Sequence, residues 1–270
     1  MTFLQSFIMG VVQGLAEFLP VSSSGHLALL DLLFHIKDGG IAFSVLLHVG
    51  TLLAAIVYFR KDIFDLLRSL APKNKEMKAE RRMVLYILIV TLVTGPIGLL
   101  FNGPMDALSK NLVVLGLCFI GTTVVLSAAE YFTHNNGKRE PESLGPVRAA
   151  FIGLVQGIAV LPGLSRSGTT IAGGMATGMS REKATRFSFL ISLPIIASAA
   201  LLDGIHVLKG TAALPSASIC VVGFIASAIA GYFAIAFMID LVKRVKLYWF
   251  AGYTFILGTL LLVLHFFFGW

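Results

Sequence analysis

Two short polar stretches carry the residue types that could do chemistry in an otherwise apolar chain. The first, PVSSSGH, runs from Pro20 to His26, and the second, PGLSRSGTT, runs from Pro162 to Thr170. In each stretch a proline stops one helix, because it lacks an amide hydrogen, and serines that make good N-caps precede the next helix. A helix start offers free backbone amides and about half a positive charge, so it attracts anions. The two stretches therefore predict two anion-binding helix starts, one near His26 and one near Thr169.

Two charged side chains accompany these helix starts. Arg166 lies inside the second stretch, and an arginine at the centre of a bilayer costs roughly 2.5 to 3.5 kcal/mol, so it needs a negative partner. Glu17 could supply that charge, but a guanidinium beside two helix starts and several hydroxyls fits a phosphate or diphosphate better. The alternative is that Arg166 and Glu17 only hold the two loops together.

His26 adds a proton acceptor to this set, and the combination fits phosphoryl transfer or hydrolysis. Two mechanisms stay open. Either a serine attacks phosphorus while His26 takes its proton, or a water attacks, activated by His26 or by a metal ion held at Glu17. Gln13 precedes Glu17 by one helical turn and therefore shares its helical face.

The composition predicts that these residues lie inside a membrane. The chain of 270 residues is 57% hydrophobic and 13% charged, with a mean hydropathy of +0.88, whereas about 25% of the residues of a soluble domain are charged. We predict an all-α integral membrane protein. Apolar runs close to the roughly 20 residues that cross a bilayer predict six transmembrane helices, at residues 43–59, 84–101, 112–131, 187–203, 215–239 and 247–268.

The formal net charge of +7 could suggest a nucleic-acid partner. The basic residues, however, flank the apolar runs, and positive-inside topology explains that position better. No nucleic acid is therefore expected as a partner.

The two polar stretches are predicted to form the tips of two re-entrant hairpins, each made of a broken helix that enters the membrane and returns.

The chain contains an internal duplication. GVVQGLAEFLPVSSSG, which begins at Gly10, matches GLVQGIAVLPGLSRSG, which begins at Gly153. We predict one membrane domain over residues 1–270, built from repeats at about residues 1–131 and 148–270. Glu17 and His26 occur only in the first copy of the motif, and Arg166 occurs only in the second.

The charge distribution predicts how the repeats are oriented. If the second motif returns to its own side of the membrane, every Lys and Arg outside the motif tips lies on one face except Lys37, Lys110 and Lys209. A motif that crossed would divide the basic residues more evenly, against the positive-inside rule. An odd number of crossings then separates the motifs, so the repeats have inverted topology and their tips meet near the midplane.

Other polar or small residues have simpler interpretations. Gly10 and Gly14 share one helical face and predict close helix packing. His48 lies in the middle of an apolar run, where an interhelical hydrogen bond is expected, with Ser192 as its counterpart in the repeat. Glu130 lies at the end of a predicted span, where solvation is easy.

The two motifs resemble those of a known family. VQGLAEFLPVSSSGH resembles the (E/Q)xxxE plus PVSS(T/S)GH region of bacterial undecaprenyl-diphosphate phosphatases, the bacitracin-resistance type called UppP or BacA, and PGLSRSGTT resembles their PGxSRSGAT region. The resemblance covers nearly the whole chain. It implies removal of the terminal phosphate from undecaprenyl diphosphate, which recycles the lipid carrier of peptidoglycan synthesis. It also implies a divalent cation, Mg or Ca, and a bacterial cytoplasmic membrane with the active site facing the outer side.

The predicted site combines these motif residues. The catalytic candidates are Glu17, Ser23, His26 and Arg166, and Gln13 and Glu17 are the candidate metal ligands. The candidate substrate-binding residues are Gln13, Ser22, Ser24, Ser165, Ser167 and Thr170. The expected partners are a polyprenyl diphosphate lipid, membrane lipids and a second copy of the chain in a homodimer.

The alternative function is a transporter or flippase of an anionic, phosphorylated lipid or small molecule, because inverted repeats with broken helices occur in transporters. Transport needs only binding, whereas hydrolysis also needs a proton acceptor and a nucleophile. The restriction of Glu17 and His26 to one repeat therefore favours the phosphatase.

Overall fold

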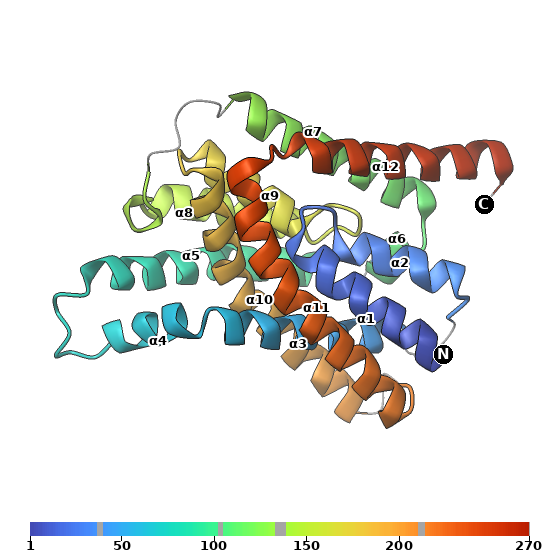
Figure 1. The fold of residues 1–270 in the computed structure, drawn as a ribbon, viewed down its shortest axis with the longest axis horizontal. Helices are drawn as coiled ribbons and strands as arrows, with labels where there is room; N and C mark the ends of the chain where they lie inside the picture. Colours follow the sequence, from blue (N-terminus) through green and yellow to red (C-terminus); the bar gives the residue numbers. More distant parts are fainter. Residues whose placement is uncertain (37–39, 102–104, 133–138, 210–213, 270) are drawn as a thin grey trace.

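The protein is almost entirely helical. The computed structural model describes residues 1–36, 40–101, 105–132, 139–209 and 214–269 (Figure 1), and across these ranges it contains helices and no strands. The prediction of an all-α protein is confirmed. The helices are α1 (Phe3–Phe18), α2 (Ser23–Leu33), α3 (Gly40–Tyr58), α4 (Arg60–Ser69), α5 (Lys78–Phe101), α6 (Met105–Ser109), α7 (Leu112–Phe132), the 3-10 turn η1 (Pro141–Ser143), α8 (Pro146–Ile158), α9 (Arg166–Ala176), α10 (Arg181–Leu208), α11 (Ala217–Arg244) and α12 (Tyr248–Phe268).

Several helices are long and apolar enough to cross a membrane. Among the described residues there are five, namely α5, α7, Arg181–Leu202 of α10, α11 and α12. The remaining predicted span, at residues 43–59, corresponds to Ala42–Tyr58 of α3. This segment is long and apolar enough to cross a membrane only together with α4, and the two helices are bent by 73° from each other. The structure thus describes a multi-pass helical bundle with five such helices, or up to six if the bent pair is one span.

Two helical hairpins are made of helices that are shorter than these spans. One consists of α1 and α2, and the other of α8 and α9. In Figure 1 the blue hairpin of α1 and α2 and the yellow-green hairpin of α8 and α9 approach each other from opposite sides. Their tips touch, because the Ser167 hydroxyl donates a hydrogen bond to the Leu19 carbonyl oxygen at 3.0 Å.

Both hairpins break at the predicted polar stretches, but the second helix of each begins earlier than predicted. The expected starts were near His26 and near Thr169, whereas α2 begins at Ser23 and α9 begins at Arg166. The cause lies in the caps. Ser22 and Ser165 are the N-cap residues of these helices, and an N-cap side chain bonds to an amide two or three residues further on.

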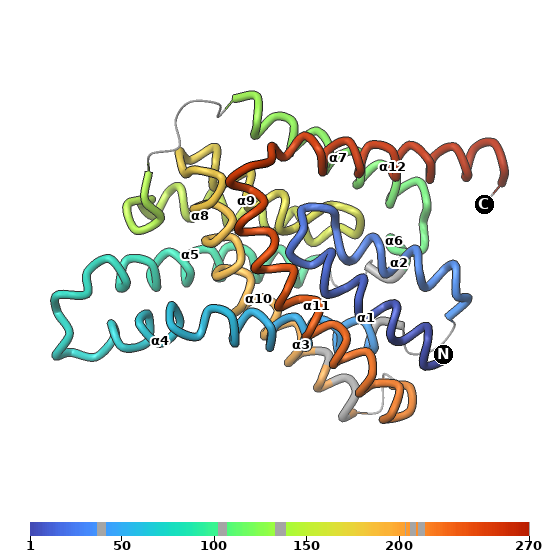
Figure 2. Tube along the Cα trace, viewed as in Figure 1, coloured from blue at the N-terminus to red at the C-terminus, as the bar shows by residue number. Residues whose placement is uncertain are grey.

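The hairpins pack against the bundle through glycines. A Cβ atom at Gly10 would lie 2.5 Å from the Gly223 oxygen of α11, and one at Gly157 of α8 would lie 2.6 Å from the Ile97 side chain of α5. The predicted role of Gly10 and Gly14 in close helix packing is therefore confirmed. Along another side of the bundle α7 and α12 run side by side (Figures 1 and 2).

We predict that Gly14→Ala destabilises the protein. The new Cβ atom would lie 2.5 Å from the Ala230 Cβ and 2.7 Å from the Gly231 nitrogen, so α1 would have to move away from α11. Overpacking of this kind costs about 1–3 kcal/mol. The measurement is thermal unfolding in detergent. The control is Gly95→Ala in α5, where no atom lies within 4 Å of the new Cβ; an equal effect of the two substitutions would contradict the close contact.

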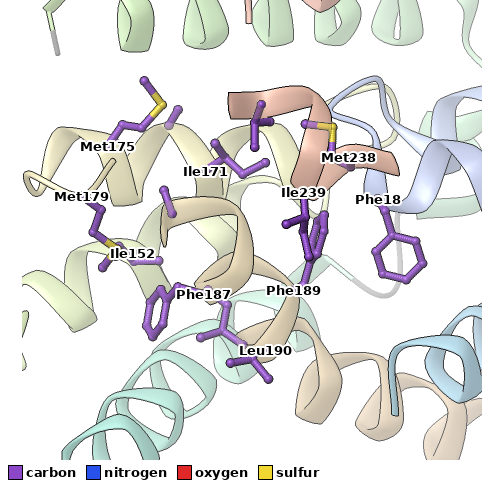
Figure 3. Packing of buried hydrophobic residues seen from close by; sticks show 14 of the residues in the cluster. Phe18, Ile152, Ile171, Met175, Met179, Phe187, Phe189, Leu190, Met238 and Ile239 are labelled. Carbon is purple, nitrogen blue, oxygen red and sulfur yellow. The ribbon is translucent and has the colours of Figure 1, made fainter. Parts of the chain in front are cut away.

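The largest of three apolar clusters among the described residues lies beside the second hairpin. Figure 3 shows Phe187, Phe189 and Leu190 of α10 among side chains of α8, α9 and α11, including Ile152 and Met238. Phe18, the last residue of α1, meets Phe189 edge to face with the ring centroids 5.2 Å apart. This contact fixes the end of α1 next to the first tip, one residue after Glu17.

The expectation that Glu130 is solvated is wrong. The residue is only 3% exposed, and its carboxylate accepts two hydrogen bonds of 2.9 Å from one nitrogen of Arg181. It also accepts the backbone N–H of Leu247 at 2.8 Å. Although Glu130 ends an apolar run, the segments that carry Arg181 and Leu247 fold over it, and that closure could not be foreseen from α7 alone.

Candidate active site

The first tip is a strained turn closed by a cap. Ser22 has a φ of 71°, an unusual backbone angle for a residue other than glycine. The N–H of Gly25 donates to its hydroxyl oxygen at 3.3 Å, and the backbone then enters α2 at Ser23. Strained backbone tends to occur at functional sites, where the surrounding structure maintains it.

The second tip is built in the same way and is held by α7. The N–H of Gly168 donates to the Ser165 hydroxyl at 3.0 Å. Thr122 of α7 accepts the Ser165 N–H at 2.9 Å and donates its own hydroxyl to the Gly163 carbonyl oxygen at 3.1 Å. Gly163 has a φ of 92° and leaves no room for a Cβ atom, which would lie 2.8 Å from the Leu115 oxygen. The second tip is therefore hydrogen-bonded to α7 and packed closely against it.

Glu17 is the centre of the contacts between the two tips. Its carboxylate forms an ion pair with Arg166 through Oε1. Its other oxygen, Oε2, accepts a hydrogen bond of 2.6 Å from the Ser23 hydroxyl and one of 2.9 Å from the Gln13 amide, and lies 3.5 Å from Nε2 of His48. The Glu17 side chain is 2% exposed and that of Arg166 is 21% exposed, so the carboxylate is enclosed while the guanidinium reaches open space.

A cavity of about 220 Å³ opens beside this cluster. Its polar lining residues come from both hairpins and from α3 and α5: Glu17, Ser22, Ser23, Ser24, His48, Thr94, Gln156, Ser165, Arg166 and Ser167. Its apolar lining residues come mainly from the hairpins and α10: Ala16, Val45, Ala159, Val160, Leu164, Ile195, Ile196, Ala199 and Ala200. The cavity thus combines a guanidinium, a carboxylate and several hydroxyls with apolar side chains.

His26 does not share this cavity with Glu17 and Arg166, although the sequence predicted that it would. Its Nδ1 lies 2.7 Å from the Ser22 carbonyl oxygen, and its Nε2 lies 2.6 Å from the hydroxyl of Tyr253. The ring stacks on Tyr253 and meets Phe119 edge to face. The ring therefore lies on the side of α2 that faces α7 and α12. Its assignment as a catalytic residue stays a prediction. In this position the ring contacts the first tip through the Ser22 carbonyl oxygen.

Two predicted substrate-binding residues also lie behind the cavity wall. Gln13 is fully buried and directs its amide nitrogen at Glu17. The Thr170 hydroxyl lies 2.8 Å from the Arg166 carbonyl oxygen and 2.5 Å from the Ser188 hydroxyl, within the protein. Both residues support neighbours that line the cavity, and neither lines it.

Three polar residues of the cavity wall were missed: His48, Thr94 and Gln156. A signal for Gln156 existed, because it is the counterpart of Gln13 in the repeat. Its amide donates to the Thr94 hydroxyl at 3.1 Å, and its buried Oε1 has no hydrogen-bond partner among the described residues. His48 has no neighbour in sequence that marks it, since it reaches the site only through the packing of α3 against α1.

The predicted metal ligands do not form a pair. A divalent cation such as Mg or Ca takes oxygen ligands, but Gln13 presents its nitrogen to Glu17, and its Oε1 is buried without a hydrogen-bond partner among the described residues. Across those residues no group of three or more His, Cys, Asp or Glu side chains could hold a metal ion. The side chains present do not fit a cation site made by the protein alone.

The cavity between the two broken-helix hairpins, inside an apolar bundle, combines a guanidinium, hydroxyls and two helix starts with apolar side chains, which is the kind of site that suits an anionic ligand with an apolar part. The chain belongs to the bacitracin resistance protein BacA family, whose family model matches residues 6–260. The family resemblance of the two motifs is thereby confirmed.

Relatives in distant organisms are similar over nearly their whole length. The protein named undecaprenyl-diphosphatase of Carboxydothermus hydrogenoformans is 40% identical, over 98% of this chain and 98% of that protein. One of the same name from Bacteroides fragilis is 40% identical over 97% of this chain and 98% of its own. A third, from Mycolicibacterium smegmatis, is 35% identical over 98% and 97%. The similarity includes both hairpins, because it spans almost all of each chain.

Proposed function

We propose that this protein hydrolyses undecaprenyl diphosphate to undecaprenyl phosphate and inorganic phosphate. The observation that carries the proposal is the cavity in which Arg166, Glu17 and two capped helix starts meet beside an apolar wall. A diphosphate on a lipid has both the negative charge and the apolar part that such a cavity favours. The relatives named undecaprenyl-diphosphatase support the same substrate.

The size of the cavity decides which part of the lipid it receives. Its volume of about 220 Å³ is below the roughly 300–1,000 Å³ of pockets that enclose a drug-sized ligand. A long prenyl chain therefore stays outside, among the membrane lipids. The diphosphate faces Arg166 and the serines, and the first carbons of the chain contact the apolar side chains of α10, such as Ile196.

The residues around Glu17 are arranged to handle a proton. The Ser23 hydroxyl donates to Oε2 of Glu17, so the carboxylate is the nearest acceptor for the Ser23 proton. If Ser23 attacks the terminal phosphorus, the bond to the bridging oxygen breaks and the lipid phosphate leaves, and water later releases the phosphate from the serine. If a water attacks instead, Ser23 and Glu17 orient it. Arg166 stabilises the negative charge on the phosphoryl oxygens in either case.

A divalent cation, Mg or Ca, is kept as part of the proposal. Mg ions in proteins are usually bound by one or two carboxylates together with substrate phosphates. Glu17 is the single carboxylate on the described cavity wall, so the diphosphate would supply most of the ligands. When bound, such an ion would neutralise phosphate charge. We also propose that the protein forms a homodimer.

We infer that the two halves are inverted repeats in the bacterial cytoplasmic membrane, with six spans and an active site facing the outer side. In the first half α1 packs on α11 of the second half, and in the second half its counterpart α8 packs on α5, the counterpart of α11. This reciprocal packing supports the inference of two repeats. Two charged pairs, Arg181 with Glu130 and Arg186 with Asp62, lie next to the ends of predicted spans. These are the span ends at which most basic residues of the chain are found. Positive-inside topology assigns these ends to the cytoplasm.

The test is phosphate release from a polyprenyl diphosphate by the purified protein in detergent. Wild-type protein is expected to release phosphate. Absence of release, together with uptake of a phosphorylated lipid or small molecule by protein in liposomes, would favour the transporter or flippase instead. The names of the relatives give that alternative no support.

We predict that His26→Ala lowers phosphate release although the ring lies outside the cavity. Its Nδ1 hydrogen bond holds the Ser22 carbonyl, and a displaced tip misplaces the reacting groups, which can cost about 100-fold in rate. Tyr253→Phe is the matched control, because it removes only the outer hydrogen bond of the same ring. A smaller loss is expected in the control. Wild-type turnover in His26→Ala would contradict the prediction.

A further inference from the structure

We propose that α4 is an interfacial helix that binds anionic phospholipids of the cytoplasmic leaflet. It begins at Arg60, two residues after the end of α3, and is bent by 73° from Ala42–Tyr58. Because α3 is predicted to run across the membrane, a bend of this size turns α4 toward the membrane plane. The inference rests on the topology proposed above, which places this end of α3 in the cytoplasm, and it is independent of the hydrolysis.

The outward face of α4 carries a stripe of large apolar side chains. Phe64 and Leu67 are each 63% exposed, and Leu70, which follows the last residue of the helix, is 56% exposed. Residues three apart share one face of a helix, so these side chains lie in one row. A row of exposed apolar side chains is stabilised when it leaves water for an apolar environment.

The opposite face of α4 is held by the protein. The Asp62 carboxylate accepts a hydrogen bond of 3.0 Å from Arg186 of α10. At the other end, Arg81 of α5 donates to the carbonyl oxygens of Ser69 and Ala71, and Ser69 is buried. Contacts at both ends thus orient α4 so that the apolar stripe faces away from the bundle.

The exposed surface around the stripe is basic. Its Lys and Arg residues, on α4 and in the turn that follows, are Arg60, Lys61, Arg68, Lys73 and Lys75. The exposed acidic residues of the same segment, 60–76, are Asp65 and Glu76, and Asp62 is paired with Arg186. A short helix with Phe and Leu on one face and Lys and Arg around it is typical of helices that lie in the membrane interface and bind anionic lipids.

An open hollow at the start of α4 fits a phospholipid head group. It is lined by Arg60, Lys61, Phe64 and Asp65. Arg60 donates to the Val57 carbonyl oxygen at 2.9 Å, which keeps its guanidinium at the end of α3, and this bond uses one of five N–H donors. Asp65 repels an anion, but the two cationic groups outnumber it, and Phe64 adds an apolar contact for the lipid.

The neighbours of α4 favour lipid over a soluble partner. α4 packs against α3 and α5, which both contain predicted spans, and Figure 1 shows it beside the start of α5. Leu85 and Leu88 of α5 are 48% and 53% exposed. Lipid that surrounds these spans therefore lies next to α4 and its apolar stripe.

The first experiment measures the depth of α4 in a bilayer. Phe64→Trp is made in a chain whose two tryptophans, Trp249 and Trp270, are replaced with phenylalanine, and the protein is reconstituted in vesicles of phosphatidylcholine and phosphatidylglycerol. Leu92→Trp in the same background is the control, because Leu92 is 72% exposed in the middle of α5. Lipids brominated near the head group are expected to quench Phe64→Trp best, since interfacial helices insert only about 5–10 Å. Lipids brominated near the chain ends are expected to quench Leu92→Trp best.

The second experiment measures the preference for anionic lipid. Brominated phosphatidylglycerol or brominated phosphatidylcholine is diluted into unbrominated phosphatidylcholine. We expect phosphatidylglycerol to reach half-maximal quenching of the α4 tryptophan at about fivefold lower mole fraction, because one Lys or Arg near an anionic leaflet contributes about that factor. Replacing Arg60, Lys61 and Arg68 together with glutamine is expected to remove the difference. Replacing Lys243 and Arg244 with glutamine, at the end of α11, is the control and is expected to keep it.

Shallow quenching together with a phosphatidylglycerol preference that only the α4 charge variant loses would support the proposal. Quenching of Phe64→Trp at the same depth as Leu92→Trp would overturn it, because α4 would then continue the span of α3. Quenching by aqueous acrylamide but by neither lipid would overturn it too and leave the stripe to a soluble partner. Equal quenching by the two lipids, or a preference that survives in the charge variant, would overturn the binding of anionic lipid. Leu67→Trp repeats the measurement if thermal unfolding shows that Phe64→Trp is misfolded.

Discussion

Replacing Arg166 with alanine is expected to abolish nearly all phosphate release. The guanidinium is the only Lys or Arg side chain on the described wall of the cavity, and it stands at the start of α9. Arginines that stabilise the transferring phosphoryl group in other enzymes contribute about 10³ to 10⁵ in kcat. We therefore expect a loss of at least about 10³-fold in kcat/KM, with KM raised because the diphosphate loses its main cationic partner.

Arg166→Lys separates charge from geometry. Lysine keeps the positive charge but cannot form two parallel hydrogen bonds to a phosphate, so an intermediate loss is expected. Arg244→Ala is the control, since the Arg244 side chain is 76% exposed and pairs only weakly with Asp240 on the surface of α11. Thermal unfolding must show that the Arg166 variants are folded, because removal of Arg166 leaves the buried carboxylate of Glu17 without its ion pair.

A double variant tests whether Arg166 and Glu17 only hold the hairpins together. Removal of one partner of a buried pair is strongly destabilising, whereas removal of both charges is often nearly neutral. If the pair were only a structural link, the double variant Glu17→Gln with Arg166→Gln would regain both stability and turnover. We expect it to regain stability and stay inactive. Restored turnover would reject the cationic cavity.

The sequence predicted the hairpins because their signals are local. Pro20 and Pro162 cannot continue a helix, and Ser22 and Ser165 cap the next one wherever the chain folds. The positions of the tips followed from these residues, and only the helix starts were placed a few residues too late. Arg166 and Glu17 were expected in one site, with a phosphate as the better partner of Arg166, and in the structure the two residues form an ion pair.

The positions of the two histidines could not be predicted from the sequence. His26 belongs to the motif, but its ring direction depends on Tyr253, which is far away in the chain and approaches only when α12 packs beside α7. His48 lies in an apolar run with no motif around it, and the packing of α3 against α1 brings it to Glu17. Both positions are set by tertiary packing, on which local propensity and spacing carry no information.

Glu17→Gln is expected to abolish turnover while it strengthens the binding of the substrate. Glutamine has the same shape and still accepts the Ser23 hydrogen bond through its oxygen, but it has no charge to take a proton. Loss of a positioned general base typically costs about 10² to 10⁴ in rate. The substitution also removes the single negative charge that faces the diphosphate on the described cavity wall and frees Arg166 to bind it. We therefore expect kcat and KM to fall together.

This pair of changes distinguishes the roles of the two charged residues. Arg166→Ala is expected to raise KM and Glu17→Gln to lower it, although both variants lose turnover. Initial rates over a range of polyprenyl diphosphate concentrations give both constants, and competition by inorganic phosphate gives an independent measure of anion affinity. A raised KM in Glu17→Gln, with an unchanged unfolding temperature, would mean that the carboxylate helps to bind the substrate. That result would fit a cation held between Glu17 and the diphosphate, because only an intervening positive charge makes a carboxylate attract a phosphate.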